Sequence, residues 1–385
     1  MNIVARDNLH FTFREIDGYN KFISFVISER EPGKSTALWL DKIYKAYQEG
    51  KTSIVIRRRI ADITDIYIDD SVEIIKKFLD PKFTVHYKRT SLKDGIVDLK
   101  KWEKVGENEE GDILEERIFC RIIGLSNPLS RLKSLVLRNL KYIIFDEFIC
   151  NPNEGEKYLT GEAFKFFELV NTFQRESLGL KCYFCGNPYS LYNPYFLELG
   201  VDTSKLKRGA ILKGDNYVVQ CYEMKQELRD LILSRNPLYK FDNAYTKYAF
   251  DGININDSNI RIEDKPVNSF IEFVFKVSNK YLSVYKNYNY NEDKRYYIEL
   301  SDDVSKKHEV FCFDIKELVN RAVLASNIEK QQFHYLKACF RRRLVVFNSI
   351  ECYYLFEEVF LNLWVKLQFI EELNFKKFII LLLII

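Results

Sequence analysis

Residues 22–48 pass from an apolar run, through a turn that contains glycine, into an amphipathic segment. The apolar run favours a buried strand, and the apolar residues of 36–48 recur at helical spacing. The turn ends in Gly33, Lys34 and Ser35, and this step between a strand and a helix is typical of a phosphate-binding loop. There the backbone N–H groups face the phosphates, Lys34 reaches the outer two phosphates, and Ser35 binds Mg²⁺. We therefore expect Gly33, Lys34, Ser35 and Thr36 to bind a nucleotide.

The turn also departs from the usual phosphate-binding sequence. Ser28 stands where a first glycine is expected, and Pro32 removes one N–H donor. We still expect Ser28 to be part of the nucleotide-binding site. Glu29 and Glu31 add negative charge near the phosphates. An ordinary strand-to-helix turn is the alternative interpretation.

Two further apolar runs end in polar residues. Residues 142–145 precede Asp146 and Glu147, and residues 182–184 lead into Gly186 and Asn187. Adjacent acids at the end of a buried strand are costly unless a cation or a protic group needs them. We expect Asp146 to hold Mg²⁺, Glu147 to activate water for ATP hydrolysis, and Asn187 to hydrogen-bond that water or the γ-phosphate. Strand-end acids in solvent and an Asn-Pro turn are the alternatives.

Arginines supply the positive charge that phosphoryl transfer requires. Residues 53–56 predict a strand that ends in Arg57, Arg58 and Arg59, and one of these three is expected to face the nucleotide. Arg175 ends an amphipathic segment whose apolar residues are Phe164, Phe167, Val170 and Phe173. We expect Arg175 to reach the γ-phosphate of a neighbouring subunit; a solvated arginine at a helix end is the alternative.

The overall charge does not indicate a nucleic-acid partner. The 385 residues include 58 basic and 55 acidic side chains, a net charge of +3. Any contact with a polyanion must therefore be local, and Lys207, Arg208 and Arg342 lie in basic stretches that suit the backbone phosphates of DNA or RNA.

The scattered cysteines and the polar first residues indicate a reduced, cytoplasmic setting. The first 15 residues are polar and charged rather than a secretory segment. Cys182 and Cys185 have the spacing of metal ligands, but no second pair accompanies them, so we expect buried strand cysteines. Residues 378–385 are all apolar, yet a membrane span needs about 20 such residues, so we expect an apolar helical tail and no membrane attachment.

The order of the predicted elements divides the chain into domains. Strands and helices alternate in residues 1–213, which predicts an α/β domain with a parallel sheet and helices on both faces. Within it, residues 84–126 predict strands around a charged turn, and residues 128–140 predict a helix. From residue 214 the pattern changes to tyrosine-rich strands, followed by a helix at 314–325. We expect a linker at 214–245, a second α+β domain at 246–348 and the tail at 349–385.

Four stretches resemble, in this order, the DNA encapsidation ATPases of small podovirus-type phages, which are relatives of terminase large subunits. The stretches are FVISEREPGKST, SIVIRRR, LKYIIFDEF and KCYFCGNPY. The resemblance implies a P-loop NTPase of the additional-strand class that uses ATP and Mg²⁺. It also implies a ring, with five subunits expected, that sits on a procapsid portal in the host cytoplasm and drives double-stranded DNA inward, with a packaging RNA in some relatives.

The resemblance also assigns residues. Lys34 and Ser35 match the nucleotide loop, Asp146 and Glu147 the two acids, Asn187 the coupling motif, Arg175 the finger, and Arg57 or Arg58 the nucleotide-sensing arginine. Lys133 lies in a lysine-serine step where contact with DNA is expected.

The resemblance describes the second domain as a ribonuclease-H-type nuclease without its metal site. Glu272, Glu299, Asp302 and Asp303 are the acids that could mimic such a site, but we expect exposed strand and turn acids and no nuclease activity. A terminase that cuts DNA is one alternative. A non-hydrolysing assembly or RNA-binding protein is the other.

Overall fold

The computed structural model describes residues 8–357, except 90–94, 109–110, 136, 138, 152–155, 176, 192, 242–245, 247–248, 251–259, 278–279, 290–293, 306, 313–321, 325–329 and 343. The chain forms two compact units, Met1–Ile255 and Asn256–Ile385. Each unit has its own sheet, and we describe them separately.

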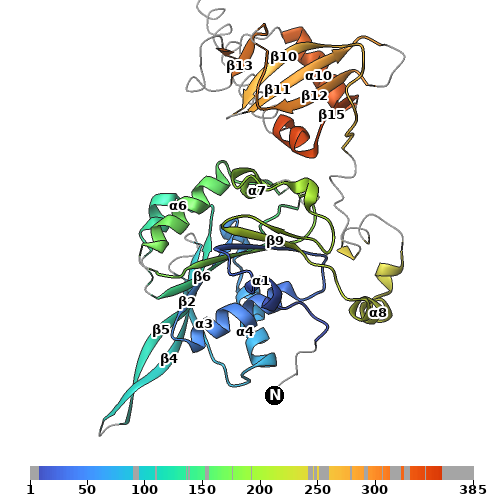
Figure 1. Ribbon diagram of the computed structural model, residues 1–385. Helices are drawn as coiled ribbons and strands as arrows, with labels where there is room; N and C mark the ends of the chain where they lie inside the picture. The colour runs from blue at the N-terminus through green and yellow to red at the C-terminus, as the bar shows by residue number, and fades with distance from the viewer. Residues whose placement is uncertain are drawn as a thin grey trace, which may run out of the picture. The chain divides into compact units, whose positions relative to one another are not determined.

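The first unit is built on a nine-stranded sheet with the order β3-β4-β5-β2-β6-β7-β1-β9-β8 (Figure 1). Its strands are β1 (Ile23–Ile27), β2 (Thr52–Arg57), β3 (His86–Arg89), β4 (Ile96–Asn108), β5 (Gly111–Gly124), β6 (Leu140–Asp146), β7 (Lys181–Gly186), β8 (Ile211–Lys213) and β9 (Tyr217–Cys221). From β5 to β9 in this order every pairing is parallel, whereas β3, β4 and β8 pair antiparallel. The apolar runs of the sequence become the central strands because both faces of a parallel sheet are buried.

The position of β7 defines the class of the fold. This strand lies between β1, which leads into the Lys34 turn, and β6, which ends at the acids. An extra strand between those two confirms the predicted additional-strand P-loop class.

Helices cover both faces of this sheet (Figure 1). They are α1 (Arg14–Asp17), α2 (Lys34–Ala37), the π-helix η1 (Leu38–Tyr44), α3 (Lys45–Gln48), η2 (Ile60–Asp62), α4 (Asp65–Phe78), α5 (Leu129–Lys133), α6 (Glu162–Gln174), α7 (Pro194–Glu198), η4 (Thr203–Lys205), α8 (Gln226–Arg235) and η5 (Pro237–Lys240). Successive strand residues point to opposite faces. Ile143 accordingly packs in the core with α6, and Ile144 packs in the core with η1 and α4.

The helix that follows the Lys34 turn is continuous but not regular. It was predicted at residues 36–48 and runs from α2 through the π-helix η1 into α3. Gly50, with a φ of 73°, follows its end as expected for a glycine stop. The π-helical turn changes which residues face inward. As a result Lys42, a charged residue, is buried at 1 % exposure, while Tyr44 and Tyr47 are only partly buried.

Three predictions for the first unit were wrong in detail. The helix predicted at 128–140 is only α5, because Leu140 already belongs to β6. In α6 the buried face includes Phe166 and Leu169, and Phe164 is 65 % exposed. The linker predicted at 214–245 contains β9, which pairs with β1 inside the sheet, and the boundary between units falls at Ile255 instead. A five-residue strand between polar loops carries too weak a pattern to be recognised alone.

The second unit has a mixed sheet with the order β14-β13-β10-β11-β12-β15. Its elements are β10 (Ser269–Val277), β11 (Lys280–Asn287), β12 (Tyr296–Ser301), β13 (Val310–Cys312), β14 (Ala322–Leu324), α10 (Lys330–Arg341) and β15 (Val345–Phe347). The α+β composition agrees with the prediction. The helix predicted at 314–325 is contradicted at residues 322–324, which form β14, and its other residues lie outside those described. Of the predicted tail, Cys352 and Phe356 pack in this core, and residues 358–385 lie outside the described part.

All eight cysteines are reduced and buried. Cys182 and Cys185 both lie in β7, but they pack in the two cores on opposite faces of the sheet. They cannot bind one metal ion together, which confirms that they are strand cysteines. Among the residues that the structure describes, no helix is long and apolar enough to cross a membrane.

Candidate active site

Three central strands deliver the predicted site residues to one edge of the first sheet. Ile27, at the end of β1, pairs with Gly186 at the end of β7, and Asp146, at the end of β6, pairs with Cys185. The strands are parallel, so their carboxyl ends lie together, and ligands of open α/β sheets bind beyond these ends. The lysine turn and the two acids therefore meet there, although more than a hundred residues separate them in the sequence.

Lys34 is surrounded by oxygen atoms of the turn and of Asn187, the residue after β7. Its Nζ atom donates to the Ser28 carbonyl oxygen (3.0 Å), Ser28 Oγ (2.8 Å), the Glu29 carbonyl oxygen (2.7 Å) and Asn187 Oδ1 (3.1 Å). Burial lowers the pKa of Lys34 to about 8. Phosphate oxygens would replace these oxygens and favour the charged amine. The contact with Asn187 places the predicted coupling residue beside the predicted phosphate ligand.

The donors and acceptors of this edge fit a nucleotide with Mg²⁺. Gly33 has a φ of 85° and precedes α2, where Thr36 lies in the first turn, so consecutive N–H groups turn toward one concave surface. Ser35 Oγ lies 3.3 Å from Asp146 Oδ2, and a hydroxyl beside a carboxylate is a ligand set that Mg²⁺ prefers. Burial raises the pKa of Asp146 to about 6, and the Arg57 guanidinium opposes that rise.

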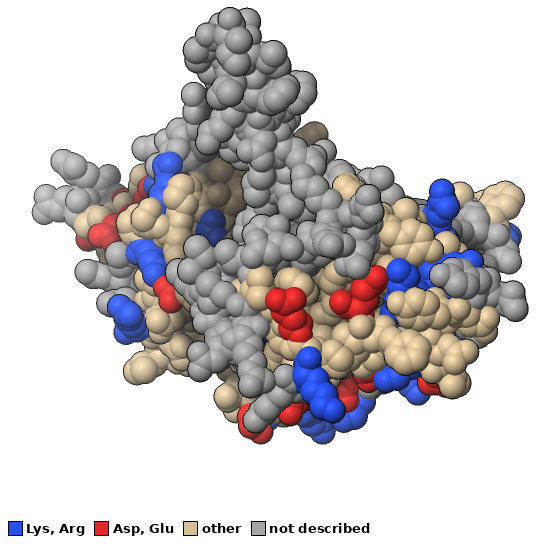
Figure 2. Space-filling model, turned by 90° about the horizontal axis from the view of Figure 1, so that it is seen from above, with Lys and Arg blue, Asp and Glu red and all other residues tan. Residues whose placement is uncertain are grey.

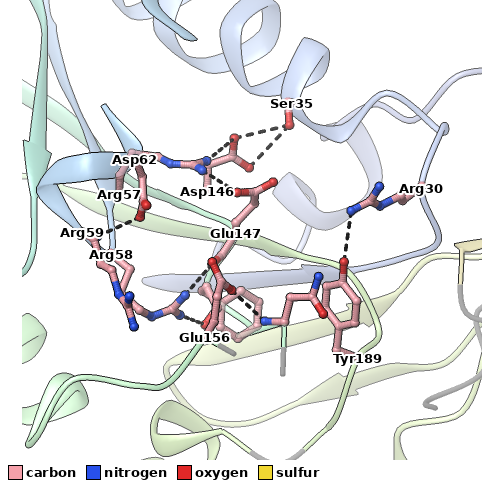
Figure 3. Close-up of polar contacts among 12 residues, drawn as sticks. Arg30, Ser35, Arg57, Arg58, Arg59, Asp62, Asp146, Glu147, Glu156 and Tyr189 are labelled. Atoms are coloured by element: carbon pink, nitrogen blue, oxygen red, sulfur yellow. Dashed lines mark hydrogen bonds and ion pairs between the residues drawn. The ribbon is translucent and has the colours of Figure 1, made fainter. Parts of the chain in front are cut away.

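Glu147 is a non-glycine residue in the left-handed region, with a φ of 60°. Such conformations are concentrated at functional sites because the surrounding structure must hold them. Its side chain is 57 % exposed and forms an ion pair with Arg57 Nη2, while Arg57 Nη1 lies 3.7 Å from Asp146 Oδ2 (Figure 3). Arg57 therefore joins both acids, and the ring of Tyr67 lies 4.9 Å from its guanidinium carbon.

Arg58 points elsewhere. Its side chain is 5 % exposed and pairs with Glu162, the first residue of α6. Of the two adjacent arginines, the structure thus places only Arg57 against the predicted catalytic and metal-binding acids.

Arg175 follows the last residue of α6 and is exposed. The 13 residues of α6 span roughly 20 Å at the helical rise per residue. The helix returns the chain from the carboxyl end of β6 to the start of β7, so Arg175 lies near the opposite edge of the sheet from Lys34. This placement does not allow Arg175 to act on the nucleotide of its own chain.

The residues predicted to contact DNA lie in both units. Lys133 pairs with Glu168, and Arg208 pairs with Glu29 of the Lys34 turn at 2.9 Å. Lys207 is exposed, and Arg342 is exposed in the second unit. On the face that Figure 2 shows, basic and acidic side chains of the described residues are interspersed.

The acids considered for a nuclease site have ordinary partners or positions. Glu272 pairs with Lys286 at 3.2 Å, and Glu299 lies 3.7 Å from Lys265. Asp302 and Asp303 are exposed beyond β12. The described residues contain no group of three or more His, Cys, Asp or Glu side chains that could hold a metal ion.

Two contributors to the site were missed in the sequence. Tyr67 lies in α4 and was not part of any motif, and Glu162 resembled an ordinary acid in the first turn of a helix. Neither residue type nor spacing distinguishes them, because their roles come from tertiary packing.

Known proteins resemble this chain over most of its length. It is 25% identical over 334 residues to the DNA packaging protein of Bacillus phage B103, covering 83% of this chain and 90% of that protein. It is 23% identical over 335 residues to that of Bacillus phage phi29, covering 86% and 90%. A chain of the bacteriophage phi29 viral genome packaging motor assembly has the same fold, with a TM-score of 0.61 and 18% identity over 92% of this chain and 99% of that chain.

The family model described as Podovirus DNA encapsidation protein (Gp16) matches residues 113–365. The match covers more than half of the chain and includes both acids, Arg175 and Asn187 as well as most of the second unit. The chain therefore belongs to the podovirus DNA encapsidation protein family.

Proposed function

We propose that this chain is an ATP-driven motor that moves double-stranded viral DNA into a procapsid. The observation that carries the proposal is the convergence of Lys34, Ser35, Asp146, Glu147 and Asn187 at one sheet edge, with Ser35 Oγ 3.3 Å from Asp146. Membership of the DNA encapsidation family supplies the expected cargo.

In this proposal each residue at the edge has a separate task. Lys34 binds the outer phosphates, and Ser35 and Asp146 hold Mg²⁺, which neutralises charge on the phosphates. Glu147 accepts a proton from the attacking water as a general base. Because Glu147 forms an ion pair with Arg57, the Arg57 guanidinium must move to the phosphate oxygens before the carboxylate can face the attacking water.

Asn187 connects the nucleotide to β7. Its side-chain oxygen accepts from Lys34 at 3.1 Å, so a phosphate that attracts Lys34 changes this contact. We propose that this change reports the state of the nucleotide to the rest of the chain.

A ring explains the position of Arg175. The residue lies roughly the length of α6 away from its own site, so it would stabilise the transition state on a neighbouring subunit. A homopentamer docked on the portal in the host cytoplasm is the assembly we propose, and contact with a packaging RNA is part of the same proposal. Sequence-independent contacts with DNA phosphates suit a motor that must grip any sequence.

DNA-stimulated ATP hydrolysis by the purified chain tests the proposal. We expect hydrolysis by the wild type and its loss in Lys34→Ala, because the amine that binds the outer phosphates is removed. Lys45→Ala is the matched control, since Lys45 lies in the same continuous helix and its side chain is 62 % exposed. Equal hydrolysis by the wild type and Lys34→Ala would support a non-hydrolysing assembly protein instead.

A further inference from the structure

The guanidinium of Arg58 is buried directly behind the two acids, where it contacts the backbone of the proposed general base. Its Nη1 atom donates to the Glu147 carbonyl oxygen at 3.2 Å (Figure 3). Its Nη2 atom donates to the Phe148 carbonyl oxygen. Its Nε atom donates to Glu162 Oε1 at 3.2 Å and Oε2 at 3.0 Å. One side chain therefore joins the end of β2, the turn after β6 and the start of α6.

These contacts fix the peptide group that follows Glu147. Its carbonyl oxygen accepts from Arg58, and its N–H group, that of Phe148, donates to the Cys185 carbonyl oxygen at 3.1 Å. A peptide group held at both ends determines the ψ angle of Glu147. The residue also has a left-handed φ of 60°, which non-glycine residues adopt only where neighbouring groups hold them.

Glu162 is itself held by three groups. Besides Arg58, the hydroxyl of Tyr195 donates to Oε1 at 3.0 Å, and the N–H group of Leu159 donates to Oε2 at 2.8 Å. Glu162 is 1 % exposed. A buried polar network in which each member has partners is rigid, and it orients the groups it contacts.

Aromatic rings complete the enclosure of Arg58. The guanidinium carbon lies 5.5 Å from the ring centre of Phe145 and 5.1 Å from that of Tyr158. With its nitrogen atoms directed at Glu162 and two backbone carbonyl oxygens, Arg58 has no group directed at the predicted phosphate site.

We propose that Arg58, held by Glu162, is a positioning residue that sets the backbone of Glu147 and thereby aims its carboxylate at the attacking water. The inference rests on the proposed ATP hydrolysis. It assigns to Arg58 a role in turnover rather than in nucleotide binding.

The test compares Arg58→Lys and Glu162→Gln with the wild type. Lysine keeps the charge but lacks the planar fork that reaches the carboxylate and both carbonyl oxygens. Glutamine keeps the shape of Glu162 but removes the charge. We expect kcat for ATP hydrolysis to fall at least tenfold in each variant, while Kd for a fluorescent ATP analogue stays within twofold of the wild type. A merely structural role would change kcat and Kd together, and that result would overturn the proposal.

The chain offers a matched control on β5. Arg117 pairs with Glu103 through Nη1 at 2.9 and 3.0 Å and donates to the carbonyl oxygens of Tyr47 (3.1 Å) and Lys51 (3.3 Å). It makes the same kinds of contact as Arg58 but touches neither acid. Arg117→Lys should leave kcat and Kd within twofold of the wild type, and a tenfold fall in kcat there would also overturn the proposal.

If Arg58→Lys and Glu162→Gln do not fold, Tyr195→Phe provides a second test. It removes one hydrogen bond to Glu162 and preserves the ring. We expect an approximately threefold fall in kcat with unchanged Kd and circular dichroism, and unchanged kcat would refute the positioning role. A wild-type chain that hydrolyses no ATP would remove the proposed function itself, whereas full turnover in a folded Glu162→Gln variant would remove only the role of Arg58.

Discussion

Replacing Lys42 with methionine is expected to change how the stability of the first unit depends on pH. Lys42 is 1 % exposed and donates to Asp17 Oδ2 at 2.6 Å, and its Nζ atom lies 3.9 Å from the ring centre of Tyr183. Burial lowers the pKa of Lys42 to about 8, although the hydrogen bond to Asp17 opposes the fall. The charged amine therefore costs stability at neutral pH.

The magnitude follows from linkage. The pKa of Lys42 falls from the ordinary lysine value of 10.5 to about 8 in the folded chain. This shift corresponds to a free energy of about 3 kcal/mol. Below pH 8 both the folded and the unfolded chain hold the proton, so the whole cost is present. Between pH 8 and pH 10.5 only the unfolded chain holds it, so the free energy of unfolding rises with pH. From pH 7 to pH 9.5 this contribution amounts to about 2 kcal/mol.

Lys42→Met removes the cost without leaving a buried charge behind. The side chain of Asp17 is 40 % exposed and keeps its hydrogen bond from the Tyr183 hydroxyl at 2.8 Å. The variant should therefore be at least as stable as the wild type at pH 7. The difference in free energy of unfolding between the variant and the wild type should fall by about 2 kcal/mol by pH 9.5. The wild type becomes more stable over this range because Lys42 loses its proton.

Urea unfolding followed by tryptophan fluorescence measures this difference, because Trp39 is buried in the same π-helix. Subtracting the free energy of unfolding of the wild type from that of the variant at each pH cancels the contributions of the other titrating groups. Lys45→Met, at an exposed position of the same continuous helix, should show no pH-dependent difference. A difference between Lys42→Met and the wild type that stays constant from pH 7 to pH 9.5 would refute the reasoning.

Three other predictions concern the active site and its surroundings. Glu147→Gln should bind ATP within twofold of the wild type but hydrolyse it about 10²- to 10⁴-fold more slowly, as expected for loss of a general base; equal turnover would exclude that role. Rings that mix Arg175→Ala with wild-type subunits should lose more ATPase activity than the mutant fraction predicts, whereas proportional loss would argue against action between subunits. Gly186→Ala should cost about 1–3 kcal/mol in urea unfolding, because a Cβ atom there would lie 3.0 Å from the Phe148 ring. Gly106→Ala, where the nearest atom is 3.5 Å away, is its control and should stay within about 0.5 kcal/mol.

The strands that carry the site could be predicted because a parallel sheet buries both faces of its strands. Apolar runs that stop abruptly before Ser28, Asp146 and Gly186 are therefore visible without tertiary information. The pairing of these strand ends also followed from the order of strands and helices. This pattern does not show which of two adjacent residues faces the site. Arg57 and Arg58 look alike in sequence, and only packing directs Arg57 to the acids and Arg58 to Glu162.

Irregular elements account for the other differences between the predictions from the sequence and the structure. The burial of Lys42 depends on a π-helical turn, which an assumption of 3.6 residues per turn cannot anticipate. Strand β9 falls in the predicted linker because the sequence pattern changes near residue 214, and its place in the sheet comes from pairing with β1. Phe164 is exposed because α6 turns Ala163 and Phe166 to the core.

The buried cysteines make this chain convenient for site-specific labelling. Burial raises the pKa of the Cys150 and Cys221 thiols to about 12, so these groups are not thiolates at neutral pH, and maleimide dyes react with thiolates. A single cysteine introduced at an exposed position, such as Leu178, should then react selectively without removal of any native cysteine. Fluorescence measurements on the otherwise native chain would become possible with one substitution.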